Sequence, residues 1–159
     1  MKDKIYAVYF SATGTTEKIV KRLAVELSNY LEKEITFYDF TLPEGRKESL
    51  HFSPKDVVIV GVPVYAGRVP NILLNYLNTI KSDGASAVAL VLYGNRNYDD
   101  ALIELKNILK TNGFNVIAGG AFIGEHSFSK ILAKNRPDEM DLENAEDFAK
   151  EIFVKLSSN

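Results

Sequence analysis

Four apolar blocks constrain the fold of this chain more than any other feature of its sequence. Each is rich in Val, Ile, Tyr or Phe and is followed by small or turn-forming residues; they cover residues 5–10, 57–64, 87–93 and 114–124. A strand with one wet face alternates apolar and polar residues, whereas a strand that is covered on both faces is apolar throughout. The four blocks therefore predict buried strands of a parallel sheet.

Helical periodicity separates these blocks, because apolar residues recur there at the spacing of an α-helix. Helices are expected over residues 19–31, 71–80, 102–109 and 142–156. Residues 34–40 predict a more polar strand, which suits the edge of a sheet, and residues 41–55 an irregular stretch with Pro and Gly. This order of elements predicts an α/β fold, a doubly wound parallel sheet of five strands with helices on both faces.

The length of 159 residues predicts a single domain over residues 1–159. With 21 acidic and 19 basic side chains, the chain has a net charge of −2, which argues against binding to nucleic acid. The absence of Cys excludes disulfides, iron–sulfur clusters and cysteine nucleophiles, and no metal site is expected. No apolar stretch is long enough for a membrane span or a secretory signal, so we expect a cytoplasmic protein without membrane insertion.

Ligand sites in such sheets lie beyond the carboxyl ends of the strands, so the loop after the first strand is the first place to look. That loop reads Ser11-Ala12-Thr13-Gly14-Thr15-Thr16. Hydroxyl and N–H donors at the start of a helix predict a phosphate site. The three glycines of a dinucleotide loop and the Lys of a triphosphate loop are missing, which favours a single phosphate monoester. The alternative is that Thr13 or Thr15 merely caps the helix.

At this loop the sequence resembles the flavodoxins, whose pattern after the first strand is Ser/Thr-x-Thr-Gly-x-Thr. Ser11, Thr13, Gly14 and Thr16 match that pattern. The resemblance extends over essentially the whole chain and implies a flavodoxin-like sheet with strand order 2-1-3-4-5. It also implies FMN as the cofactor, with its phosphate held by residues 11–16.

Electron transfer between redox partner proteins is the function that this resemblance implies. The partners would be a ferredoxin-type donor or a reductase, and an acceptor that the sequence does not identify. The chain would then be an electron carrier more than a turnover enzyme, so no catalytic residue is assigned.

The loop after the third strand of this predicted sheet is the second candidate flavin loop. It contains Pro63, Val64, Tyr65, Ala66, Gly67 and Arg68. The resemblance implies that this loop covers one face or edge of the isoalloxazine ring, with Tyr65 as an aromatic wall. A peptide near Gly67 would be the one that flips its carbonyl toward the reduced ring. The alternative is a turn that carries a partly buried Tyr.

The loop after the fourth strand is the third candidate. It contains Tyr93, Gly94, Asn95, Arg96, Asn97 and Tyr98. Its Asn side chains and backbone groups can hydrogen-bond the pyrimidine edge of a flavin, and Tyr93 or Tyr98 can lie beside the ring. Arg68 and Arg96 depart from the acidic surroundings common in flavodoxins, which predicts a less negative potential for the second reduction.

His126 follows the last strand and is a further candidate for contact with the flavin. It could donate protons near neutral pH, or it could be a structural residue that makes a hydrogen bond. Its surroundings, with residues 113–114, 121–129 and 136–138, resemble the flavodoxin-like half of flavodoxin–ferredoxin fusion proteins. Since a ferredoxin half is rich in Cys and this chain has none, we expect a stand-alone relative or only one half.

Three other functions stay open at this point. An FMN-dependent NAD(P)H:quinone or flavin reductase uses the same fold, and the loop over residues 94–97 resembles that of flavodoxin-like activators of ribonucleotide reductase. A flavin-free interaction scaffold is the third. A receiver domain needs an acidic cluster after the first strand, and a low-molecular-weight tyrosine phosphatase needs a loop Cys; neither is present.

Overall fold

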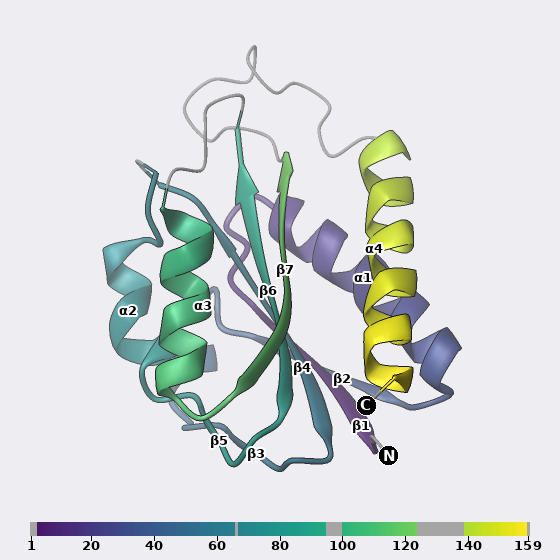
Figure 1. Ribbon diagram of the computed structural model, residues 1–159. Helices are drawn as coiled ribbons and strands as arrows, with labels where there is room; N and C mark the ends of the chain where they lie inside the picture. Colours follow the sequence, from purple (N-terminus) through teal and green to yellow (C-terminus); the bar gives the residue numbers. More distant parts are fainter. Residues whose placement is uncertain (1–2, 66, 95–99, 124–138, 159) are drawn as a thin grey trace.

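The computed structural model describes residues 3–65, 67–94, 100–123 and 139–158 (Figure 1). In this part of the chain the main sheet has five parallel strands in the order β2-β1-β4-β6-β7. Their bounds are β1 Lys4–Tyr9, β2 Ile35–Asp39, β4 Asp56–Pro63, β6 Ser86–Tyr93 and β7 Asn115–Ile123. Counted within the main sheet alone, this is the order 2-1-3-4-5, so the predicted fold is confirmed, with the polar strand at one edge.

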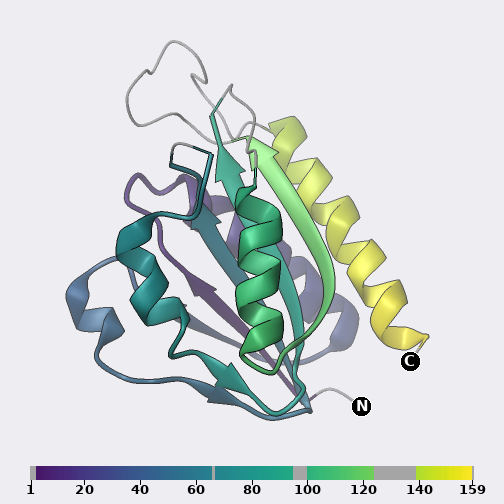
Figure 2. The same cartoon turned by 60° about the vertical axis from the view of Figure 1, so that its left-hand side comes forward.

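Helices cover both faces of the sheet (Figures 1 and 2). The helices α1 (Thr15–Leu31) and α4 (Glu139–Ser157) lie on one face, and α2 (Asn71–Leu77) and α3 (Ala101–Thr111) lie on the other. The central strands β1, β4 and β6 therefore contribute alternate side chains to two separate cores. In β4, Ile59 packs toward α1 and Val60 toward α2, and both are fully buried. Burial on both faces explains why the strands lack polar alternation.

Short elements interrupt the stretch that we expected to be irregular, and one of them pairs with a later part of the chain. The two-residue strands β3 (His51–Phe52) and β5 (Lys81–Ser82) pair in parallel as a second small sheet. A 3₁₀ helix, η1 (Pro43–Arg46), precedes β3. Segments of two to four residues are too short to display a period, so the sequence pattern did not predict them.

The helix α2 ends at Leu77, three residues before the end that we predicted. The amide group of Asn112, which is buried at the end of α3, donates a hydrogen bond of 2.9 Å to the carbonyl of Leu77. The chain then enters β5 at Lys81. A side chain from a distant part of the chain thus bonds the last carbonyl of α2, and local periodicity does not reveal this contact.

Backbone hydrogen bonds join the loops beyond the strand ends at the upper edge of the sheet in Figure 1. The N–H of Phe10 donates to the carbonyl of Gly61 at 3.1 Å, and that of Val64 donates to the carbonyl of Leu92 at 2.8 Å. These bonds bring the loops after β1, β4 and β6 side by side. None of the helices in the described ranges is both long and apolar enough to cross a membrane.

Candidate functional site

The loop between β1 and α1 is fixed at both ends by backbone geometry and hydrogen bonds. Gly14 adopts φ 87° immediately before α1, a left-handed conformation that other residues rarely take. The hydroxyls of Thr13 and Thr15 pair with each other at 3.2 Å, and the first-turn N–H of Glu17 donates to Ser11 Oγ at 3.0 Å. Ser11 therefore accepts one of the first N–H groups of α1, while the hydroxyls of Thr13 and Thr15 bond each other instead of the start of the helix.

Thr16 has a buried hydroxyl whose surroundings bear on ligand binding. Its side chain is 1% exposed, and its Oγ1 is buried without a hydrogen-bond partner within the described part of the chain. Buried hydroxyls are nearly always hydrogen-bonded, because an unpaired one loses its hydration without compensation. This hydroxyl lies in the first turn of α1, where unpaired N–H groups and the helix dipole favour an anion. The arrangement fits a phosphate group.

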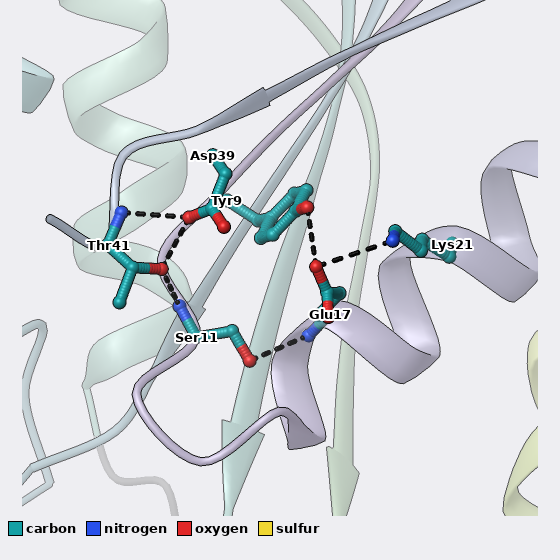
Figure 3. Close-up of polar contacts among 6 residues, drawn as sticks. All are labelled: Tyr9, Ser11, Glu17, Lys21, Asp39 and Thr41. Atoms are coloured by element: carbon teal, nitrogen blue, oxygen red, sulfur yellow. Dashed lines mark hydrogen bonds and ion pairs between the residues drawn. The ribbon is translucent and has the colours of Figure 1, made fainter. Parts of the chain in front are cut away.

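A chain of hydrogen bonds ties this loop to the end of β2 (Figure 3). The backbone N–H of Ser11 donates to Thr41 Oγ1 at 2.8 Å. The hydroxyl and the N–H of Thr41 both contact Asp39 Oδ1, at 2.5 and 2.9 Å. The segment after the edge strand is thus bonded directly to the first residue of the candidate phosphate loop.

A second anchor joins β1 to the first turn of α1. The hydroxyl of Tyr9, which is buried, donates to Glu17 Oε2 at 2.7 Å, and Lys21 Nζ lies 3.4 Å from the same oxygen. Burial, with the neighbouring Glu17 carboxylate, raises the pKa of the Tyr9 phenol well above its ordinary value of 10.0. Tyr9 therefore remains a proton donor at physiological pH.

These four residues around the loop, Tyr9, Glu17, Asp39 and Thr41, were not among the predicted site residues. An Asp two residues before a Thr is a local pattern in which the carboxylate accepts the later N–H, and this pattern was visible in the sequence. The bond from Ser11 to Thr41 spans 30 residues, so no local pattern reveals it.

The loop after β4 forms a tight turn. Tyr65 and Arg68 exchange two backbone hydrogen bonds of 3.0 Å, with Gly67 at φ 77° between them. The Tyr65 side chain is 37% exposed at the same edge of the sheet, so a planar ligand could reach it. Pro63 and Val64 are half-buried, and Ala66 lies outside the described residues.

Glu104 on α3 holds this turn through three hydrogen bonds. Its carboxylate accepts from Arg68 Nε and Nη2 at 3.1 and 2.6 Å, and from the N–H of Val69 at 2.9 Å. The bond from the Arg68 guanidinium lowers the pKa of Glu104, and the same contact raises that of Arg68. Glu104 of α3 therefore lies beside Arg68 as its counter-charge.

The third loop is described only at its start. Tyr93 and Gly94 are half-buried at the end of β6, and Tyr93 is in register with Ile123 of β7. The predicted residues Asn95, Arg96, Asn97, Tyr98 and His126 lie outside the described residues. Among the side chains that are described, no cluster of His, Asp or Glu could hold a metal ion.

A family model for the flavodoxin domain matches residues 6–123. The chain belongs to the flavodoxin domain family. The match includes all three loops at the carboxyl edge of the sheet up to the end of β7. Members of this family normally bind a flavin. No curated protein matches the sequence significantly.

Solved structures of flavodoxins have the same fold as this flavodoxin domain. A flavodoxin from the domain Archaea is 14% identical, with a TM-score of 0.63 over 97% of this chain and 99% of that one. Oxidised flavodoxin 2 from Bacillus cereus is 19% identical, with a TM-score of 0.65 over 96% and 98%.

A longer protein contains a similar unit. Rubredoxin oxygen:oxidoreductase from Desulfovibrio gigas is 19% identical, with a TM-score of 0.69 over 99% of this chain but only 37% of that chain. At these identities the structural similarity establishes the fold alone. The family is established separately, by the match to its sequence model.

Proposed function

We propose that this flavodoxin domain binds FMN and transfers electrons between redox partner proteins. The observation that carries the proposal is the buried, unpaired Oγ1 of Thr16 in the first turn of α1. It lies in a loop that matches the flavodoxin phosphate pattern, and it offers a donor for which the described residues provide no acceptor. A phosphate monoester supplies that acceptor.

Residues 11–16 would hold the phosphate. The first N–H groups of a helix have no intrahelical acceptor. Those of Thr15 and Thr16 are therefore available at the start of α1, together with the loop hydroxyls. Gly14 contributes no side chain at the helix start, and a Cβ built on it would meet no atom within 4 Å, so this side of the loop is open.

The loops after β4 and β6 would flank the ring, with residues 63–68 on one side and residues 93–98 on the other. When bound, FMN supplies one- and two-electron chemistry, and the protein supplies orientation and exclusion of water. Among the described residues of these two loops, Tyr65 is the exposed aromatic side chain, and Glu104 fixes the turn that carries it. We further propose that His126 lies near the flavin edge.

Reconstitution with FMN tests cofactor binding. Protein incubated with excess FMN and then desalted is expected to keep flavin absorption at about one FMN per chain. Thr16→Val keeps the shape of the side chain but removes the hydroxyl, so it should weaken FMN binding about tenfold by removing one hydrogen bond to a charged group. Thr36→Val, at an exposed position of β2, is the matched control. Wild-type protein that elutes without flavin would refute the proposal.

Electron transfer needs a separate assay. The FMN-loaded protein, reduced anaerobically by a chemical reductant, should pass electrons to a one-electron acceptor such as cytochrome c. It should not oxidise NADH or NADPH in the steady state. Sustained NAD(P)H oxidation would instead identify the FMN-dependent reductase that shares this fold.

A further inference from the structure

We propose that Thr41, oriented by Asp39, is a positioning residue that holds Ser11 and the start of the phosphate loop in the conformation that a phosphate monoester requires. This inference rests on the proposed FMN binding, because it concerns the same loop. It adds a role for a segment that follows β2 and lies outside the three loops predicted to contact the flavin.

The direction of the hydrogen bonds follows from counting protons (Figure 3). The hydroxyl of Thr41 has one hydrogen, and an ionised Asp carboxylate can only accept. The hydroxyl hydrogen therefore points to Asp39 Oδ1, and a lone pair of Thr41 Oγ1 faces the N–H of Ser11 at 2.8 Å. Ser11 thus donates to Thr41, and Thr41 donates to Asp39.

This direction fixes both polar groups of Ser11. Its backbone N–H points toward the segment after β2, while its Oγ accepts the N–H of Glu17 from α1 at 3.0 Å. Ser11, from which residues 12–16 continue, is therefore held both by the segment after β2 and by α1. A loop held in this way loses less conformational entropy when it closes on a ligand, which raises affinity without a new contact.

The backbone around Thr41 is itself held in place by hydrogen bonds. Arg46 of η1 donates from Nε to the carbonyl of Phe40 at 2.9 Å and from Nη2 to that of Thr41 at 2.7 Å. The side chain of Phe40 is fully buried in the hydrophobic core. Thr41 therefore cannot simply follow Ser11 if the loop moves, which is the property that a positioning residue needs.

Comparing FMN with riboflavin isolates the phosphate loop, because the two flavins share the ring and ribityl chain and differ in the phosphate. We would measure dissociation constants for both ligands by flavin fluorescence. Thr41→Val should weaken FMN binding about tenfold, since it leaves the N–H of Ser11 without an acceptor, and change riboflavin binding by less than about twofold. Thr41→Ser keeps the hydroxyl and should therefore keep the wild-type affinity for FMN. Thr36→Val in the edge strand β2 should change the affinity for neither flavin.

Asp39→Ala is a second variant that leaves Thr41 in place. Asp39 is exposed, so this change should not prevent folding even if Thr41→Val does. Without the carboxylate the Thr41 hydroxyl is free to rotate, and we expect FMN affinity to fall about threefold while riboflavin affinity stays constant.

The outcomes separate this inference from the proposed function. If the wild type prefers FMN to riboflavin, but Thr41→Val or Asp39→Ala weakens both flavins equally or neither, Thr41 has no positioning role and FMN binding still stands. If the wild type binds neither flavin, the proposed function fails, and the inference fails with it. A selective loss of FMN affinity that Thr41→Ser reverses supports both.

Discussion

At the scale of single residues, the buried Tyr9 joins β1 to the first turn of α1 beside the candidate site. Its hydroxyl donates to Glu17, whose side chain is 36% exposed. Tyr9→Phe removes this bond, but water can still reach the Glu17 carboxylate, so the free energy of unfolding should fall by only about 1 kcal/mol. Urea unfolding monitored by circular dichroism measures this change.

Tyr30→Phe provides the control for that prediction. Tyr30 is exposed on α1 and its ring stacks on Phe153, an interaction that the substitution keeps. We expect Tyr30→Phe to match the wild type within about 0.5 kcal/mol. Equal stabilities for the two variants would contradict a contribution from the bond between Tyr9 and Glu17.

Sequence reasoning at this scale identified the loop hydroxyls but not the residues that hold them. Ser11 and Thr16 follow a buried strand directly, so their place at the sheet edge could be predicted. Thr41 bonds to Ser11 across 30 residues, and Glu104 bonds to Arg68 across 36. Such partners depend on how the elements pack, and a single sequence does not encode that packing in any local pattern.

At the scale of elements, the contact between α3 and the turn after β4 should make stability depend on pH. The pKa of Glu104 in the folded protein lies below its ordinary value of 4.5, mainly because of the hydrogen bond from Arg68. A lowered pKa stabilises the fold fully above the unfolded pKa, and that stabilisation is lost as the pH falls through the folded pKa. The difference in stability between wild type and Glu104→Gln should therefore be constant above about pH 5 and shrink below it.

Denaturant unfolding between pH 3 and pH 7 measures this difference, with Glu151→Gln on the exposed face of α4 as the control. The free energy of unfolding of this control should differ from that of the wild type by the same amount at every pH. If Glu104→Gln also differs from the wild type by a constant amount, the carboxylate does not hold the turn in solution.

The long elements were predictable for a physical reason that the short ones lack. A strand such as β4 packs against helices on both faces, so its whole length is apolar and its ends are visible within one or two residues. The strands β3 and β5 have two residues each, and the last carbonyl of α2 accepts a hydrogen bond from Asn112 at the end of α3. Length and local capping therefore decided which boundaries could be read from the sequence.

At the scale of the whole molecule, the topology explains why the three loops that the sequence singled out lie at one edge of the sheet. Parallel strands place all their carboxyl ends at one edge, so the loops after β1, β4 and β6 must meet there. The site is therefore distributed over the central strands, and a ligand that spans it connects parts of the chain that are more than 80 residues apart, from Ser11 to Tyr93.

That distribution predicts stabilisation of the whole fold by FMN. A ligand that binds the folded state alone adds about 2.7 kcal/mol to the free energy of unfolding at a hundredfold excess over its Kd. For a domain of this size the midpoint of thermal unfolding should then rise by roughly 5–10 °C. In the proposed binding mode, inorganic phosphate contacts the loop between β1 and α1 and riboflavin the two ring loops, so each should give a smaller rise at the same concentration. A rise with riboflavin equal to that with FMN would show that residues 11–16 contribute nothing to binding.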